Sequence, residues 1–111
     1  MITNVEASDD ILTWQSDGCN YQTALCKGTY IYDNDNILLM DEGKSKVAAL
    51  NEKGQIIKEL ENSNELFLMY LQKHPRFGLT VIASLKDSEG SWKDYYLALK
   101  SNKFEKASKA R

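Results

Sequence analysis

Short apolar and β-branched segments alternate along this chain with polar turn sequences, at intervals too short for a succession of helices. Such spacing is typical of antiparallel strands joined by tight hairpins. The turn sequences are Ser16-Asp17-Gly18, Asp33-Asn34-Asp35-Asn36, Asp41-Glu42-Gly43, Glu52-Lys53-Gly54, Asn62-Ser63-Asn64, Asp87-Ser88-Glu89-Gly90 and Ser101-Asn102-Lys103.

The pattern predicts eight or nine short strands. Polar and apolar residues alternate most clearly at Thr29–Tyr32, whereas Ile37–Met40 is continuously apolar and is predicted to be covered on both faces. The predicted fold is mainly β: residues 1–111 form a single antiparallel β-sheet domain, a blade-like sandwich or half-barrel, with one short helix near 63–73. The predicted strands are 10–14, 21–26, 29–32, 37–40, 46–51, 55–60, 79–85, 93–99 and 104–109.

The helix prediction depends on the signals around the segment 65–72. Asn62 followed three residues later by Glu65 has the form of a helix start, and His74-Pro75 forms a plausible stop. A buried strand over the same residues is the alternative, but apart from the aromatics most residues of the segment are fair to good helix formers. We favour the helix here.

Composition indicates a globular chain. Its 111 residues are 42% hydrophobic with one proline, which is enough for a core that needs neither metal nor disulfide. No apolar run approaches the roughly 20 residues of a membrane-spanning helix, and Met1–Trp14 lacks the features of a signal peptide. We therefore expect a cytoplasmic protein without membrane contact. Cys19 and Cys26 are predicted to be reduced thiols, with a disulfide closing a short hairpin as the alternative.

The net charge of −2 conceals a gradient along the chain. Residues 1–42 contain eight acids and one lysine, for a net charge of −7, while residues 43–71 are balanced. Residues 72–111 contain nine basic residues and four acids, for a net charge of +5. Charges of this kind are ordinary on loops and solvent-facing positions; gathered on one surface, they would steer a basic partner toward it.

None of the candidate catalytic or metal motifs is complete. Counted from Asp33, the sixth and twelfth positions of a calcium loop are Leu38 and Lys44 instead of glycine and glutamate. His74 is the only histidine and has no nucleophile motif near it. Acid pairs such as Asp9-Asp10 point to opposite faces of a strand and do not converge. We therefore predict no enzyme activity, no cofactor and no metal site.

An alternative site lies in the C-terminal third. Trp92, Tyr95 and Tyr96 are interleaved with lysines there, a pattern that could stack single-stranded nucleic acid or hold a small ligand. The chain is acidic overall, with a pI near 5.4, which makes nucleic acid the less favoured partner.

Residues 36–60 resemble one NHL-type β-propeller repeat. An apolar strand ends at Asp41, and a second hairpin turns at Asn51-Glu52-Lys53-Gly54, where Gly54 supplies a positive φ. The resemblance implies a blade-like antiparallel sheet and assigns no functional residue. A closed propeller needs at least four blades, which 111 residues cannot form.

The expected function follows from charge and from the missing catalytic motifs. In size and acidity the chain is similar to small bacterial toxin-immunity proteins, which bind and neutralise a cognate toxin. We therefore expect a non-enzymatic protein that binds a basic, nuclease-like toxin. The predicted partner-binding residues are Asp33, Asp35, Asp41 and Glu42.

Overall fold

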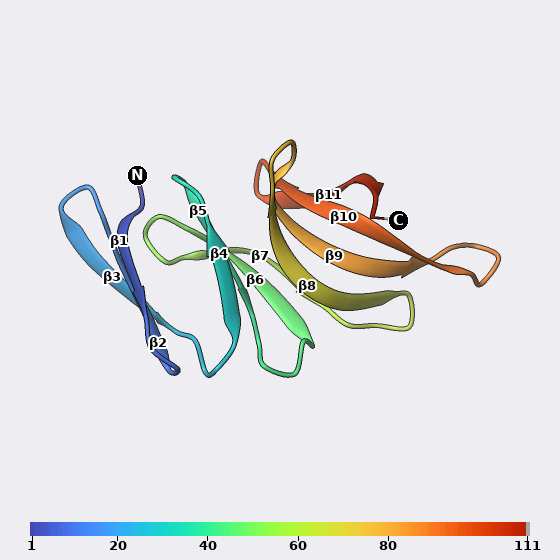
Figure 1. The fold of residues 1–111 in the computed structure, drawn as a ribbon, viewed down its shortest axis with the longest axis horizontal. Helices are drawn as coiled ribbons and strands as arrows, with labels where there is room; N and C mark the ends of the chain where they lie inside the picture. The colour runs from blue at the N-terminus through green and yellow to red at the C-terminus, as the bar shows by residue number, and fades with distance from the viewer. Residues whose placement is uncertain (111) are drawn as a thin grey trace.

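The chain runs as a continuous series of antiparallel hairpins (Figure 1). The structure, a computed structural model, describes residues 1–110. Strands that are consecutive in sequence pair within three sheets, in the orders β1-β2-β3, β4-β5-β6-β7 and β8-β9-β10-β11. The strands are β1 (Thr3–Ala7), β2 (Ile11–Ser16), β3 (Cys19–Ala24), β4 (Thr29–Tyr32), β5 (Asn36–Met40), β6 (Lys46–Asn51), β7 (Ile56–Glu61), β8 (Leu66–His74), β9 (Gly78–Lys86), β10 (Trp92–Lys100) and β11 (Lys103–Lys109).

Two hairpins close through two-residue turns that their sequences predict. Between β2 and β3, Asp17 and Gly18 have φ values of 50° and 77°, and between β10 and β11, Ser101 and Asn102 have 50° and 66°. Positive φ at both central positions defines the type I′ turn, whose twist matches that of the paired strands. These turns set the register of their hairpins from local sequence alone.

The second sheet lies between the other two and contributes to a hydrophobic core on each of its faces (Figure 1). Leu38 of β5 packs with Leu68 of the third sheet, while the adjacent Ile37 packs with Trp14 of the first. Successive side chains of a strand point to opposite faces, so the apolar run Ile37–Met40 serves both cores. The prediction that this strand is covered on both faces is confirmed.

The prediction of a mainly β, antiparallel domain is also confirmed, but the strands form three sheets instead of one curved sheet. The strands of residues 36–60 lie in the second sheet as β5, β6 and β7. A sheet that is apolar on both faces needs a layer on each side to bury them. The chain supplies these layers by passing from the first sheet to the second after β3 and from the second to the third after β7.

The predicted helix near 63–73 is wrong, because Leu66–His74 forms the nine-residue strand β8. Pairing with β9 along its length satisfies the backbone groups on one side of this edge strand, and a bulge between Leu68 and Tyr70 accommodates one extra residue. Asn62, the predicted helix cap, accepts a hydrogen bond from the backbone amide of Leu68 at 2.8 Å. The capping side chain thus binds the start of a strand.

Strand β1 has no counterpart among the predicted strands. Its five residues include a single large apolar side chain, Val5, which packs against the core between the first and second sheets. Asn4 has a φ of 53° and lies within a bulge of the β1–β2 pairing, so the strand shows no simple alternation. Only its pairing with β2 identifies the segment as a strand.

Candidate functional site

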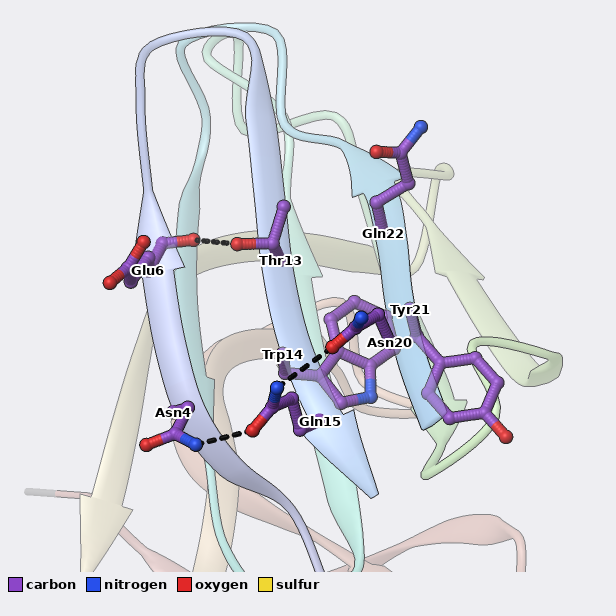
Figure 2. A pocket seen from close by; sticks show the side chains of 8 residues that line it. All are labelled: Asn4, Glu6, Thr13, Trp14, Gln15, Asn20, Tyr21 and Gln22. Carbon is purple, nitrogen blue, oxygen red and sulfur yellow. Dashed lines mark hydrogen bonds between the residues drawn. The ribbon is translucent and has the colours of Figure 1, made fainter. Parts of the chain in front are cut away.

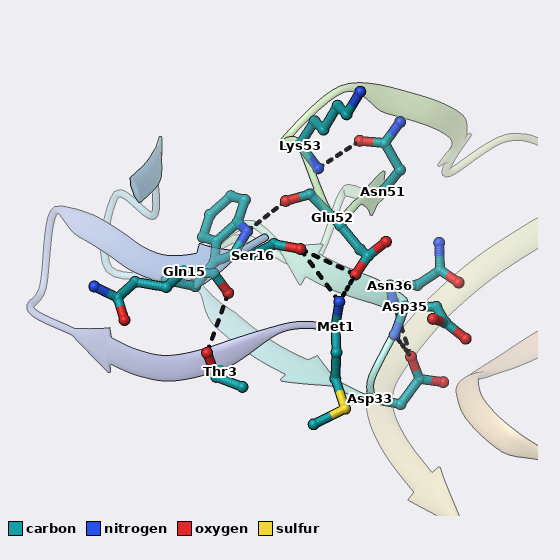
Figure 3. A network of polar contacts seen from close by, with 11 residues as sticks. Met1, Thr3, Gln15, Ser16, Asp33, Asp35, Asn36, Asn51, Glu52 and Lys53 are labelled. Atoms are coloured by element: carbon teal, nitrogen blue, oxygen red, sulfur yellow. Dashed lines mark hydrogen bonds and ion pairs between the residues drawn. The ribbon is translucent and has the colours of Figure 1, made fainter. Parts of the chain in front are cut away.

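Turns of successive hairpins emerge alternately at the two ends of the sheets, because every antiparallel connection reverses the chain. The β2–β3, β4–β5 and β6–β7 turns therefore share one end (Figure 3). They bring together four acids that we call the acidic turn cluster: Asp17, Asp33, Asp35 and Glu52. The amino group of Met1 lies beside Glu52 and Ser16. The hydrogen bond to Glu52 raises the pKa of this amino group, and the charges of Asp17 and Asp35 add to this effect.

A polar network orders the centre of this cluster (Figure 3). The Met1 amino group is paired with the carboxylate of Glu52 and donates to Ser16 Oγ at 3.3 Å. Ser16, which is buried, in turn donates to Glu52 Oε1 at 3.0 Å. The bond to the Met1 amino group, followed by that from Ser16, lowers the pKa of Glu52. Glu52 is therefore a paired carboxylate, and Asp17, Asp33 and Asp35 provide the net negative charge.

Asp33 and Asp35 have different roles within their turn. Asp33 Oδ1 accepts hydrogen bonds from the backbone amides of Asp35 and Asn36, both at 2.9 Å, so this side chain shapes the turn. Such an Asp turn is a stable local structure. The side chain of Asp35 is exposed at the tip, where a partner can reach it.

Asp41 and Glu42, the other two predicted partner-binding residues, lie at the opposite end of β5. This five-residue strand separates the two turns by about 17 Å. Asp41 accepts from the backbone amides of Ser45 and Lys46 and, at 2.6 Å, from the hydroxyl of Ser45. The structure therefore splits the four predicted residues into two pairs, and Asp41 has a turn-forming role like that of Asp33.

We expect the Asp41→Asn variant to be about 1 kcal/mol less stable at neutral pH, because the hydrogen bonds to its carboxylate are weakened. The hydroxyl of Ser45, followed by the Lys46 and Ser45 amides, lowers the pKa of Asp41 below its ordinary value of 3.8. A lowered pKa stabilises the fold above pH 3.8 and loses this effect as the pH falls through the folded value.

Urea unfolding of both proteins between pH 3 and 7 measures this difference. The difference in unfolding free energy between wild type and variant should narrow as the pH falls below 3.8. Glu42→Gln is the matched control, since it removes the neighbouring exposed charge. A constant difference between Asp41→Asn and wild type at all pH values would contradict the assignment.

The outer face of the first sheet carries a shallow polar hollow of about 560 Å³ (Figure 2). Asn4 donates to Gln15, and Gln15 donates to Asn20 at 2.9 Å, forming a row of amides across three strands. The amides bond to one another and supply neither a nucleophile nor a general base, and the one carboxylate in the lining is that of the exposed Glu6. This face is best described as a polar, solvent-facing surface.

His74, for which no catalytic role is predicted, has a structural position, and the C-terminal aromatics do not form the alternative stacking platform. His74 Nδ1 accepts from the backbone amides of Arg76 and Phe77, at 3.0 and 3.2 Å, and so closes the β8–β9 turn. Tyr95 packs against the core between the second and third sheets, whereas Tyr96, the next residue, stacks edge-on against His74. The predicted aromatic platform is therefore divided between the two faces of β10.

The remaining candidate chemistry gives no further site. Cys19 and Cys26 are exposed free thiols. Cys19 is the first residue of β3 and Cys26 follows the end of that strand, which is about 20 Å long, whereas a disulfide needs Cα atoms within about 7 Å. Over residues 1–110 no group of three or more His, Cys, Asp or Glu side chains is placed to hold a metal ion. The same residues include no helix long and apolar enough to cross a membrane.

Comparison with known proteins identifies no relative of this chain: no protein-family model matches it, and no curated protein or solved structure is significantly similar.

Proposed function

We propose that this protein is a non-enzymatic binding protein that recognises a basic protein partner through the acidic turn cluster. The mode of action would be that of an immunity-type inhibitor, which neutralises a cognate toxin inside the cell. One observation carries the proposal: three turns from two sheets place Asp17, Asp33, Asp35 and Glu52 at the same end of the molecule.

Electrostatics explains why this end suits a basic partner. Glu52 is neutralised by the Met1 amino group, which leaves the charges of three aspartates on turns ordered by backbone hydrogen bonds. Figure 3 shows the side chain of Lys53 extending away from Asp33 and Asp35. Charges on ordered turns lose little entropy on binding, and they mainly raise the association rate.

A nuclease-like toxin fits this surface by its chemistry. An enzyme that cleaves nucleic acid presents cations to phosphate groups, and carboxylates on projecting turns can occupy the same positions. Such an inhibitor needs no catalytic residues of its own. Its selectivity would come from the spacing of the turn tips, which the sheets hold in register.

We expect the double reversal Asp17→Lys/Asp35→Lys to weaken the partner complex at least tenfold, which corresponds to about 1.4 kcal/mol. The effect should appear mainly as slower association, and association of the wild type should slow as salt is added. Asp10→Lys/Glu42→Lys is the matched control, because it changes the net charge equally at the opposite end of the sheets. That control should change affinity by less than about twofold.

The measurement has two stages. Tagged protein is used to capture and identify the partner from its source cells, and stopped-flow mixing of the two purified proteins then gives association rates at several salt concentrations. Recovery of no protein partner would contradict the proposal. Equal effects of the two double reversals would also contradict it, because the interaction would then depend on net charge instead of the cluster.

A further inference from the structure

The outer face of the third sheet exposes a group of large apolar side chains. Phe67, Tyr70 and Trp92 are 57%, 45% and 46% exposed. Strand register places Tyr70 and Tyr96 opposite Ile82, and Phe67 opposite Ser84, all on one side of the sheet. We call this surface the aromatic face, comprising Phe67, Tyr70, Trp92 and Tyr96; Ile82, on the same side of the sheet, is only 2% exposed. The opposite side of the same strands carries Leu68, Val81 and Leu97, which fill the core toward the second sheet.

The two ends of the three-sheet stack differ in polarity. The outer face of the first sheet carries the amides of Asn4, Gln15 and Asn20, and this polar surface terminates the stack (Figure 2). Stacked architectures need such polar outer faces at their ends to remain soluble. The aromatic face lacks that property, and exposed apolar patches of this kind mark interaction surfaces. The stack therefore ends in a polar face at the first sheet and in an exposed aromatic face at the third sheet (Figure 1).

We propose that the aromatic face binds a second copy of this chain, with the two third sheets packed face to face about a two-fold axis. Six sheets would then stack continuously, and the polar outer faces of both first sheets would terminate the assembly. An isologous contact of this kind uses one self-complementary patch on each copy.

The size of the face agrees with a dimer interface. Nine-residue strands are about 30 Å long, and four strands spaced about 5 Å apart give a face of roughly 500 Å². Two copies would bury about 1,000 Å², the lower limit of a specific protein interface. Aromatic side chains dominate the binding energy of such interfaces.

Charge also favours a second copy over an acidic partner. By strand register the charged residues on this side of the sheet are Lys86, Asp94, Lys100, Lys103 and Glu105. Their net charge is +1, far below the +5 of residues 72–111, so two identical faces can meet without strong repulsion. Asp94 already accepts a hydrogen bond from Ser84 within the face.

Pairing along the β11 edge is a poorer route to self-association than packing of the aromatic face. Strand β11 is an edge of the third sheet and carries Lys103, Lys106 and Lys109. Lysines along an edge strand oppose pairing with a second chain. A dimer formed through the aromatic face should be weakened by substitutions in that face, whereas a dimer paired along β11 should depend on the β11 lysines.

Sedimentation velocity over a range of concentrations tests the dimer. We expect the mass to rise from 12.6 kDa to twice that value as concentration increases, with a dissociation constant in the micromolar range expected for a small interface. Phe67→Glu and Trp92→Glu should each weaken the dimer about thirtyfold or more, as interface hot spots do. Ile11→Glu is the matched control, because Ile11 is 42% exposed and lies on the outer side of the first sheet.

A second measurement uses the unaltered protein and remains informative if a variant fails to fold. The chain has two tryptophans, of which Trp14 is buried and Trp92 is exposed. Acrylamide should quench Trp92 fluorescence in dilute solution and do so less in concentrated solution. A mass of 12.6 kDa at every concentration, together with unchanged quenching, would overturn the proposal.

Two further outcomes separate this contact from other modes of association. A dimer that survives both aromatic-face substitutions, or one that Ile11→Glu weakens equally, would overturn the proposal. Asp17→Lys/Asp35→Lys should leave the dimer constant unchanged, because the acidic turn cluster belongs to the first and second sheets. The dimer can therefore fail or succeed independently of the proposed partner binding.

Discussion

Trp14→Ala is expected to destabilise the protein by about 3–5 kcal/mol, the usual cost of removing a buried aromatic side chain. Trp14 is 1% exposed and belongs to the core that joins the first and second sheets. Its ring stacks with Tyr21 at a centroid distance of 6.0 Å. Its Nε1 donates to the backbone carbonyl of Glu52 at 2.7 Å, so the substitution also removes a bond between two sheets.

The same contact connects the core to the candidate site. Because Glu52 lies in the β6–β7 turn, Trp14 helps to hold that turn against the first sheet. Trp14→Phe should cost less than Trp14→Ala, since it retains much of the ring and loses chiefly the hydrogen bond. We therefore expect Trp14→Ala to weaken partner binding as well as stability.

Urea unfolding followed by far-UV circular dichroism, in dilute solution, measures these free energies without relying on tryptophan fluorescence. Trp92→Ala provides the control, because that side chain is 46% exposed and should contribute less than about 1 kcal/mol to the monomer. Similar losses for Trp14→Ala and Trp92→Ala would show that the core between the first two sheets has been misassigned.

Gly28→Ala is expected to cost about 3 kcal/mol through steric conflict. Gly28 lies in the connection between β3 and β4, where the chain passes from the first sheet to the second. A Cβ atom there would lie 2.2 Å from the carbonyl oxygen of Met40 and 2.9 Å from that of Leu25. Both are backbone atoms, so relief requires β4 to move away from β5 or the connection to shift.

Gly43→Ala is the matched control, since the nearest atom to its added Cβ is Asp41 Oδ2 at 3.5 Å, an ordinary contact. That variant should stay within about 0.5 kcal/mol of wild type. Thermal unfolding detects the difference, because a loss of 3 kcal/mol lowers the melting temperature of a domain this size by roughly 10 °C or more. Equal melting temperatures for the two variants would refute the steric argument.

Local bonding decides which acids can be altered without unfolding the protein. Asp33 and Asp41 each accept two backbone amides within their own turns, so their replacement changes the turn as well as the charge. Asp17 and Asp35 are exposed, which makes them the better positions for charge reversal. Because Asp17 has a φ of 50° in a type I′ turn, the stability of its lysine variant is measured alongside binding. This division separates loss of binding from loss of fold.

Local sequence predicted most of the strands, because each hairpin is closed by residues that favour a turn and flanked by β-formers. The two-residue turns at Asp17-Gly18 and Ser101-Asn102 are examples. The segment 65–72 could not be assigned in this way. Its apolar residues have no single period, and the capping signal at Asn62 is compatible with either structure. The segment forms a strand because it pairs with β9, and this pairing is a tertiary contact.

The candidate site was predicted in part. Sequence identified the acidic first 42 residues and two members of the cluster, Asp33 and Asp35. Asp17 and Glu52 are also turn residues, and counting hairpin reversals would have placed them at the same end. The same count would have placed Asp41 and Glu42 at the opposite end from Asp33 and Asp35, because strand β5 lies between the two turns.

By itself the sequence determined the β class, most of the strand boundaries, the turn chemistry and the uneven distribution of charge. These features depend on side-chain preference and on period-two alternation, which act over a few neighbouring residues. Only the tertiary structure decided that the strands divide into three stacked sheets, which acids share an end, and which sheet face stays apolar and exposed. Each of these depends on contacts between distant segments, such as that of Trp14 with Glu52, and local preference contains no information about them.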